Sequence, residues 1–144
     1  MRDLRDFWND HYAVDPYRNL EVFLLRNLPR IGVGFFRRSG FYPDFILWIT
    51  SRVAERTRVL FIEPHGLHHG GLGGNQDKIE ALKELQAVSE EAPFQNKKIS
   101  LGGYLLTDTE LKEIPGAEDK DWATLERDYR VLHQEGAYMQ KILT

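Results

Sequence analysis

The spacing of apolar residues predicts helices in three parts of the chain. Residues 17–28 (YRNLEVFLLRNL) and 75–88 carry apolar side chains every three to four positions, which places them on one face of a helix. Pro29 ends the first helix, and Asn75, a favoured N-cap residue, begins the second. The tail after Asp108 has a similar stripe. The inward positions are Leu20, Phe23, Leu24 and Leu28, then Ile79, Leu82, Leu85 and Val88, and in the tail Trp122, Leu125, Tyr129 and Leu132.

Short runs that are apolar at nearly every position predict strands. Residues 41–50 (FYPDFILWIT) and 58–63 (RVLFIE) are apolar on both alternating faces, which indicates central strands covered from both sides. The polar segment between them is short, so we expect an antiparallel hairpin. Residues 98–107 predict another strand, whose glycine pair indicates a bulge or a close approach. Residues 32–37 predict a further short strand.

These elements predict an α/β fold, a mixed central sheet with helices on both faces. The 144 residues fit one domain, with a core over about residues 17–107 and a helical extension over 108–144. The chain has no cysteine, which excludes disulfides and thiolate metal sites. No apolar run reaches the roughly 18 residues of a membrane span, and the start (MRDLRDFWND) is charged, so we expect a cytoplasmic protein.

Two carboxylates, Asp44 and Glu63, stand at the ends of the predicted hairpin strands. Burial of a lone carboxylate is costly unless a cation or a donor compensates it. If the two residues are paired across the hairpin, their Cβ atoms are roughly 4.5–5.5 Å apart on one face, and a divalent ion between them would relieve the repulsion. This register also sets Ile46 opposite Phe61 and Trp48 opposite Val59.

The same residues resemble the motif of a nuclease superfamily. Residues 41–44 (FYPD), followed by a strand and then residues 61–65 (FIEPH), are similar to the PD-(D/E)xK pattern. The likeness covers roughly residues 20–107. It is closest to the nuclease-like domains at the C-terminal end of type III restriction subunits and of DEAD/DEAH-type helicases. The resemblance implies a restriction-endonuclease-like fold that cleaves DNA, with Mg²⁺ or Mn²⁺ held by Asp44 and Glu63.

The chain departs from the family pattern at the lysine that orients the attacking water, which is His65 here. His65 could act as a general base, could join the metal shell, or could mark a nuclease that has lost activity. Lys78, in the first turn of the next predicted helix, could instead supply a displaced lysine. Glu21, on the first predicted helix, is the candidate third metal ligand. Alternatively, Glu21 is a surface residue paired with Arg18 or Arg26.

The charge is unevenly distributed along the chain. Residues 1–62 carry ten arginines, no lysine and seven acids, a net charge of +3, whereas the rest carries −6. Arginine suits phosphate oxygens, so we expect an arginine-rich face to bind DNA, although a merely solvated face has the same composition. A helicase motor or a restriction partner subunit is the protein partner that the resemblance implies. The arginines assigned to the DNA face are Arg37, Arg38, Arg52 and Arg56.

Two other functions fit the same residues. Glu63, His65, His68 and His69 could form a zinc or nickel site of a metallohydrolase that cleaves small phosphoesters. The same fold could also serve as a catalytically inactive DNA-binding or protein-docking module. The absence of the family lysine and the acidic second half of the chain favour this second alternative.

Overall fold

The computed structural model describes residues 2–34, 40–64, 67, 70–91 and 95–144. Its centre is a five-stranded mixed sheet, in which the strands lie in the order in which they occur in the sequence. Neighbours among the first three strands are antiparallel, and the last two strands are each parallel to the strand before them. The strands are β1 (Leu20–Arg26), β2 (Phe45–Ser51), β3 (Arg56–Glu63), β4 (Ile99–Thr107) and β5 (Val131–His133).

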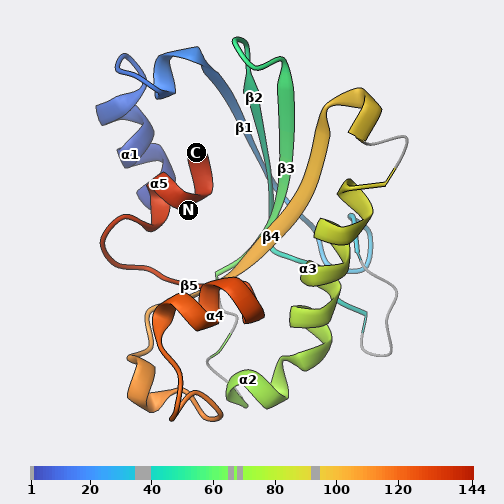
Figure 1. Ribbon diagram of the computed structural model, residues 1–144, viewed down its shortest axis with the longest axis vertical. Coiled ribbons are helices and arrows are strands. Elements are labelled where there is room, and N and C mark those ends of the chain that lie inside the picture. Colours follow the sequence, from blue (N-terminus) through green and yellow to red (C-terminus); the bar gives the residue numbers. More distant parts are fainter. Residues whose placement is uncertain (1, 35–39, 65–66, 68–69, 92–94) are drawn as a thin grey trace.

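Helices cover both faces of the sheet (Figure 1). The helices are α1 (Arg2–His11), α2 (Gly71–Gly74), α3 (Gln76–Ser89), α4 (Trp122–Tyr129) and α5 (Tyr138–Leu143), with short 3-10 turns at Tyr17–Asn19, Gln95–Lys97 and Leu111–Glu113. On one face α1 and α5 bury Leu4 and Ile142 against Leu47. On the other face α3 and α4 bury Leu82 and Leu125. The predicted α/β class, a mixed sheet between two layers of helices, is therefore confirmed.

The predicted hairpin has the predicted register. Ile46 lies opposite Phe61 and Trp48 opposite Val59 in an antiparallel β2–β3 pair. Helix α3 and strand β4 also lie where the sequence predicts them, and together they form a crossover that returns β4 parallel to β3. The close approach predicted at the glycine pair occurs at Gly103, where a Cβ atom would lie 2.3 Å from the carbonyl oxygen of Phe61.

The predicted helix over residues 17–28 is wrong, because most of this segment is the edge strand β1. Every residue of β1 pairs with β2. Leu20 and Val22 pack against the α1–α5 layer, whereas Phe23, Leu24 and Leu25 are exposed, so only the first half of this edge strand is covered. The helix that precedes this strand is α1, whose Leu4 is buried. Helix α1 is not among the elements predicted from the sequence.

The predicted helical tail is correct in part, because α4 and α5 form but a strand lies between them. Helix α4 ends at Tyr129, its C-cap residue Arg130 has a left-handed φ of 58°, and the chain then adds β5 to the sheet beside β4. Leu132 therefore lies in a strand rather than on the predicted helical stripe. The predicted strand at 32–37 is not formed over the described residues 32–34, and residues 35–37 lie outside the described part. In the described ranges, no helix is long and apolar enough to cross a membrane.

Candidate active site

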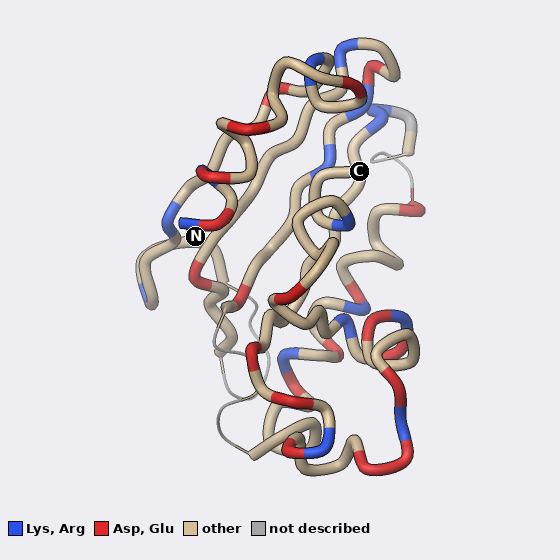
Figure 2. The backbone as a smooth tube through the Cα atoms, turned by 90° about the vertical axis from the view of Figure 1, so that its left-hand side faces the viewer, with Lys and Arg blue, Asp and Glu red and all other residues tan. Residues whose placement is uncertain are grey.

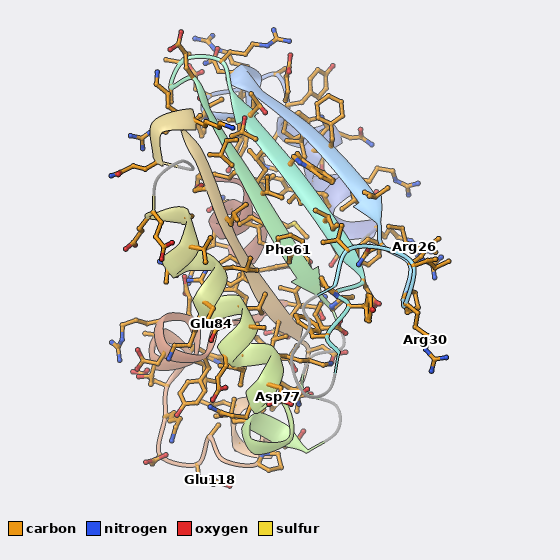
Figure 3. All side chains as sticks on the ribbon, turned by 90° about the vertical axis from the view of Figure 1, so that its right-hand side faces the viewer. Arg26, Arg30, Phe61, Asp77, Glu84 and Glu118 are labelled. Atoms are coloured by element: carbon orange, nitrogen blue, oxygen red, sulfur yellow. The ribbon has the colours of Figure 1, made fainter. Side chains whose placement is uncertain are left out.

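The two carboxylates singled out in the sequence lie at the same end of the sheet. Asp44 directly precedes β2, and Glu63 is the last residue of β3. The ladder between these strands ends at the pair Phe45–Ile62, so Asp44 and Glu63 stand one position beyond it. Because side chains alternate along a strand, Glu63 shares the face of Phe61, the face that α3 covers (Figure 3).

Glu63 is buried, yet it lines a cavity. Its exposed fraction is only 7%, whereas Asp44 is half-buried. The cavity has a volume of about 460 Å³, and its walls include Arg30, Tyr42, Glu63 and Lys78. A carboxylate at the wall of such a space is the kind of ligand that divalent cations such as Mg²⁺ accept.

Lys78 also lines the cavity. It lies in the first turn of α3, next to Ile79, whose side chain is 2% exposed and fixes the helix against the sheet. Its ammonium nitrogen lies 5.7 Å from the ring centroid of Phe41, a distance at which the ring attracts a cation. The structure thus brings Lys78 and Glu63 to one cavity, as the sequence analysis suggested that it could.

A buried amide that the sequence analysis missed fixes the backbone around Asp44. Asn27 directly follows β1 and is only 5% exposed. The pattern of apolar residues does not identify it, because its side chain is polar. Its backbone N–H donates to the carbonyl oxygen of Asp44 at 2.7 Å, and its side-chain amide donates to the carbonyl oxygen of Pro43 at 2.9 Å. The same amide also bonds with both backbone groups of Val33. Asn27 therefore joins the end of β1, the following loop and the residue before Asp44.

Arg30 belongs to the arginine-rich first part of the chain, but the sequence did not assign it to this site. It lies in the loop that follows Asn27, has a left-handed φ of 68° and lines the cavity. Figure 3 shows Arg26 and Arg30 near the same end of the sheet, but only Arg30 is among the residues that line the cavity. A cation at this position depends on a loop conformation, which a periodic pattern does not reveal.

Glu21 is not brought to this site. It lies on β1 opposite Thr50, near the turn end of the β2–β3 hairpin, and pairs with Arg52. The seven residues of β2 separate this end from Asp44 by about 20 Å, given 3.3 Å per residue. The expectation of a third carboxylate assumed a helix at Glu21, and the helix is absent. The geometry instead matches the alternative of a surface ion pair, although the partner is Arg52.

Of the four arginines assigned to a DNA face, Arg52 and Arg56 lie away from the cavity. Arg52 and Arg56 are exposed at the turn end of the hairpin, where several of the basic positions of the molecule lie (Figure 2). Arg37 and Arg38 lie outside the described residues, as do His65, His68 and His69. Within the part of the chain that the structure describes, no three His, Cys, Asp or Glu side chains gather closely enough to hold a metal ion.

Comparisons of the chain with protein-family models, with curated proteins and with solved structures find no match. What this end of the sheet can do chemically therefore follows from its residues: two carboxylates, one of them buried, and two cations that share its cavity.

Proposed function

We propose that this protein hydrolyses phosphodiester bonds in DNA, with a divalent metal ion, at the cavity between β3 and α3. The observation that carries the proposal is that the buried carboxylate of Glu63 and the ammonium group of Lys78 line one cavity beside Asp44. In metal-dependent phosphodiester hydrolysis, carboxylates can hold the metal ion, and a nearby lysine can donate a hydrogen bond to the attacking water or to the phosphate.

The residues present fit a magnesium ion. Mg²⁺ is usually bound through one or two carboxylates, and water and phosphate oxygens complete its shell. Glu63 and Asp44 offer the two carboxylates, and a cavity of about 460 Å³ has room for the remaining ligands. When bound, such an ion lowers the pKa of a coordinated water and shields the charge that develops on the phosphate.

We assign to Lys78 the role of orienting the attacking water or binding the phosphate. In the PD-(D/E)xK superfamily a lysine two residues after the second acid has this role, and His65 stands at that position here. Lys78 shares the cavity with Glu63, so its ammonium group can donate a hydrogen bond to the attacking water or to a phosphate oxygen. His65 stays a prediction for a general base.

The order of the elements supports the family assignment. From α1 through β4 the chain runs helix, strand, antiparallel hairpin, helix and parallel strand. This is the order expected of a restriction-endonuclease-like domain, although the helix and the strand that open it are α1 and β1 rather than the segments predicted from the sequence. The helicase motor or restriction partner subunit remains a proposal that rests on the resemblance.

The turn of the β2–β3 hairpin offers a second contact with DNA. Arg52 and Arg56 lie about 20 Å from Asp44, given the length of β2. Phosphates along one DNA strand recur every 3.4 Å, so this distance corresponds to about six base pairs. We therefore propose that a duplex cut at the cavity reaches these arginines with its flanking phosphates.

Incubation with supercoiled plasmid in Mg²⁺ or in EDTA tests this function. We expect nicked circles in Mg²⁺ alone. Binding of the plasmid without nicking in either condition would instead support a catalytically inactive DNA-binding module, which the histidine at position 65 favours. Hydrolysis of a small chromogenic phosphoester, with no effect on the plasmid, would point to the histidine-loop metallohydrolase.

A further inference from the structure

Arg58 is a partly buried arginine on the face of the sheet that α1 and α5 cover. It lies on β3 two residues before Leu60, which belongs to the core of that face, and it stands opposite Ile49 of β2, which is only 2% exposed. Side chains alternate along a strand, so the side chain of Arg58 leaves the sheet among these apolar residues. Glu63 lies on the other face, and Arg58 is not among the residues that line the cavity.

One nitrogen of the Arg58 guanidinium group lacks a partner. Its Nη1 atom is buried and makes no hydrogen bond within the described part of the chain. Arg18, Arg52 and Arg127 each pair with a carboxylate, whereas Arg58 has no such partner among the described residues, which include every Asp and Glu of the chain. A buried donor without an acceptor costs free energy, so such a group in a native protein indicates a function or a bound ligand.

A second guanidinium group, that of Arg130, is held over β4 on the same face. Its Cζ atom lies 4.3 Å from the ring centroid of Tyr104, and its Nε atom donates to the carbonyl oxygen of Gly103 at 3.2 Å. A Cβ atom at Gly102, which pairs with Leu60 of β3, would lie 3.8 Å from Nη2 of Arg130. The group therefore extends across β4 toward β3. Within the described residues its two terminal nitrogens make no hydrogen bond, so both can donate to a ligand.

The two guanidinium groups act on each other. Burial lowers the pKa of Arg58, the phenol of Tyr104 raises it, and the positive charge of Arg130 lowers it further. An anion between two like charges in a partly buried place relieves both the repulsion and the lack of an acceptor. Ser100 pairs with Arg58 across β3 and β4 and is exposed, so a ligand can approach from solvent and meet a hydroxyl donor on the same face.

We propose that Arg58 and Arg130 form a phosphate-binding site on the α1–α5 face of the sheet, separate from the cavity. A guanidinium group offers parallel N–H donors that match two oxygens of a phosphate group, and the two arginines offer them from neighbouring parts of one sheet face. The site goes beyond the proposed function and does not rest on it. Such a phosphate group belongs either to a small phosphate ester or to the backbone of DNA.

Calorimetric titrations in EDTA test the site with two probes, inorganic phosphate and a short DNA duplex. We expect Arg58→Met to weaken phosphate binding by about tenfold or more, the effect of losing a hydrogen bond between charged groups. Arg130→Asn, which tolerates the left-handed backbone of this position, should do the same. Arg127→Met is the matched control, because Arg127 lies in the last turn of α4 but is exposed and paired with Asp128. This variant should bind both probes as the parent does.

The stability of Arg58→Met separates a binding role from a structural one. Without phosphate, the variant should be at least as stable as the parent in urea, because it removes an unpartnered buried donor and a repelling charge. Phosphate should raise the melting temperature of the parent and of Arg127→Met more than that of Arg58→Met, since a specific site adds to the general effect of the salt. A loss of stability in Arg58→Met with unchanged phosphate binding would show that Arg58 is structural only, and would overturn the site.

The two probes also identify the source of the phosphate group. If both variants weaken binding of inorganic phosphate alone, the site takes a small phosphate ester. If they weaken binding of the duplex, with or without an effect on inorganic phosphate, the site takes the DNA backbone. No binding of either probe by the parent, or equal effects of Arg58→Met and Arg127→Met, would overturn it.

Nicking of plasmid in Mg²⁺ keeps this inference distinct from the proposed function. A protein that binds phosphate through Arg58 but never cuts DNA would contradict the proposed function and support the site. A protein that cuts DNA, but whose binding of both probes is unchanged by Arg58→Met and Arg130→Asn, would overturn the site and leave the proposed function intact.

Discussion

Asn27 and Pro43 are joined by a hydrogen bond of 2.9 Å from the buried side-chain amide to the carbonyl oxygen. The bond connects the end of β1 to the residue before Asp44, and two further bonds tie the same amide to Val33. Because each buried bond contributes about 0.5–1.5 kcal/mol, Asn27→Ala should lower the free energy of unfolding by about 2–4 kcal/mol in urea titrations. Asn19→Ala, which removes an exposed bond to Asp15, is the control. A similar small loss in both variants would contradict the structural role of Asn27.

Asp44 is predicted to be a ligand of the divalent ion. Asp44→Asn should abolish the binding of Mn²⁺ measured by calorimetry, because an amide oxygen is a far weaker ligand than a carboxylate. Without metal, the variant should be at least as stable as the parent, since a negative charge near Glu63 has been removed. Glu55→Gln changes an exposed carboxylate that pairs with Lys98 and serves as the control. Mn²⁺ binding by Asp44→Asn with parental affinity would show that Asp44 is not a ligand.

Lys78 is predicted to act in the chemical step. Lys78→Ala should reduce the single-turnover rate of DNA cleavage by about 10²–10⁴-fold, the usual range for a group that assists proton transfer. Lys83→Ala, on the exposed side of the same helix α3, should cleave normally. Equal cleavage rates for the two variants would show that Lys78 does not act in the chemical step.

His65 is the alternative candidate for the group that activates the attacking water. If His65 is a general base, it must be neutral to accept a proton, so the cleavage rate should fall as the pH drops through its pKa. His65→Ala should remove this acid limb and most of the rate, whereas His65→Lys should retain activity if the position only orients water. A pH–rate profile of the parent and both variants decides this. Full activity in His65→Ala with an intact acid limb would exclude the base.

Tyr138 is predicted to make stability depend on alkaline pH. Burial of its phenol, and then its hydrogen bond to Asp3 of α1, raise the pKa of Tyr138 well above its ordinary value of 10. The folded state therefore keeps a proton that the unfolded state loses above about pH 10, so this contribution is complete below pH 10 and is lost as the pH rises further. Tyr138→Phe should destabilise the protein by about 0.5–1.5 kcal/mol at pH 7 and flatten the alkaline decline in unfolding free energy. Tyr12→Phe, at an exposed tyrosine, should change neither, and an unchanged alkaline decline in Tyr138→Phe would contradict the assignment.

The sequence predicts the centre of the fold better than its edges. Strands β2 and β3 are buried on both faces, so Ile46, Phe61 and their neighbours allow one sensible register, which the structure has. The spacing of apolar residues in 20–26 (LEVFLLR) fits a helix, but the segment is a strand because it pairs along the whole of β2. The local pattern cannot reveal pairing with a distant segment of the chain. Strand β5 has only three residues, too few for any period to show.

The candidate site divides in the same way. Asp44, Glu63 and Lys78 could be chosen from the sequence because a charge beside an apolar run stands out, and the structure brings Glu63 and Lys78 to one cavity. Glu21 could not be placed, because its distance from the site depends on whether β1 is a strand. Arg30 and Asn27 depend on a loop closed by hydrogen bonds between distant residues, for which the one-dimensional pattern carries no signal.

The most direct test of metal-dependent cleavage at this cavity is the rate at which the parent protein and Glu63→Gln cut a fluorescent DNA duplex in Mg²⁺. Glu55→Gln, at an exposed glutamate, controls for the change in net charge. The account predicts that the parent and Glu55→Gln release shortened strands at the same rate, that EDTA stops both, and that Glu63→Gln is inactive at every Mg²⁺ concentration. Cleavage by Glu63→Gln at the parental rate, or the absence of any Mg²⁺-dependent product from the parent, would contradict it.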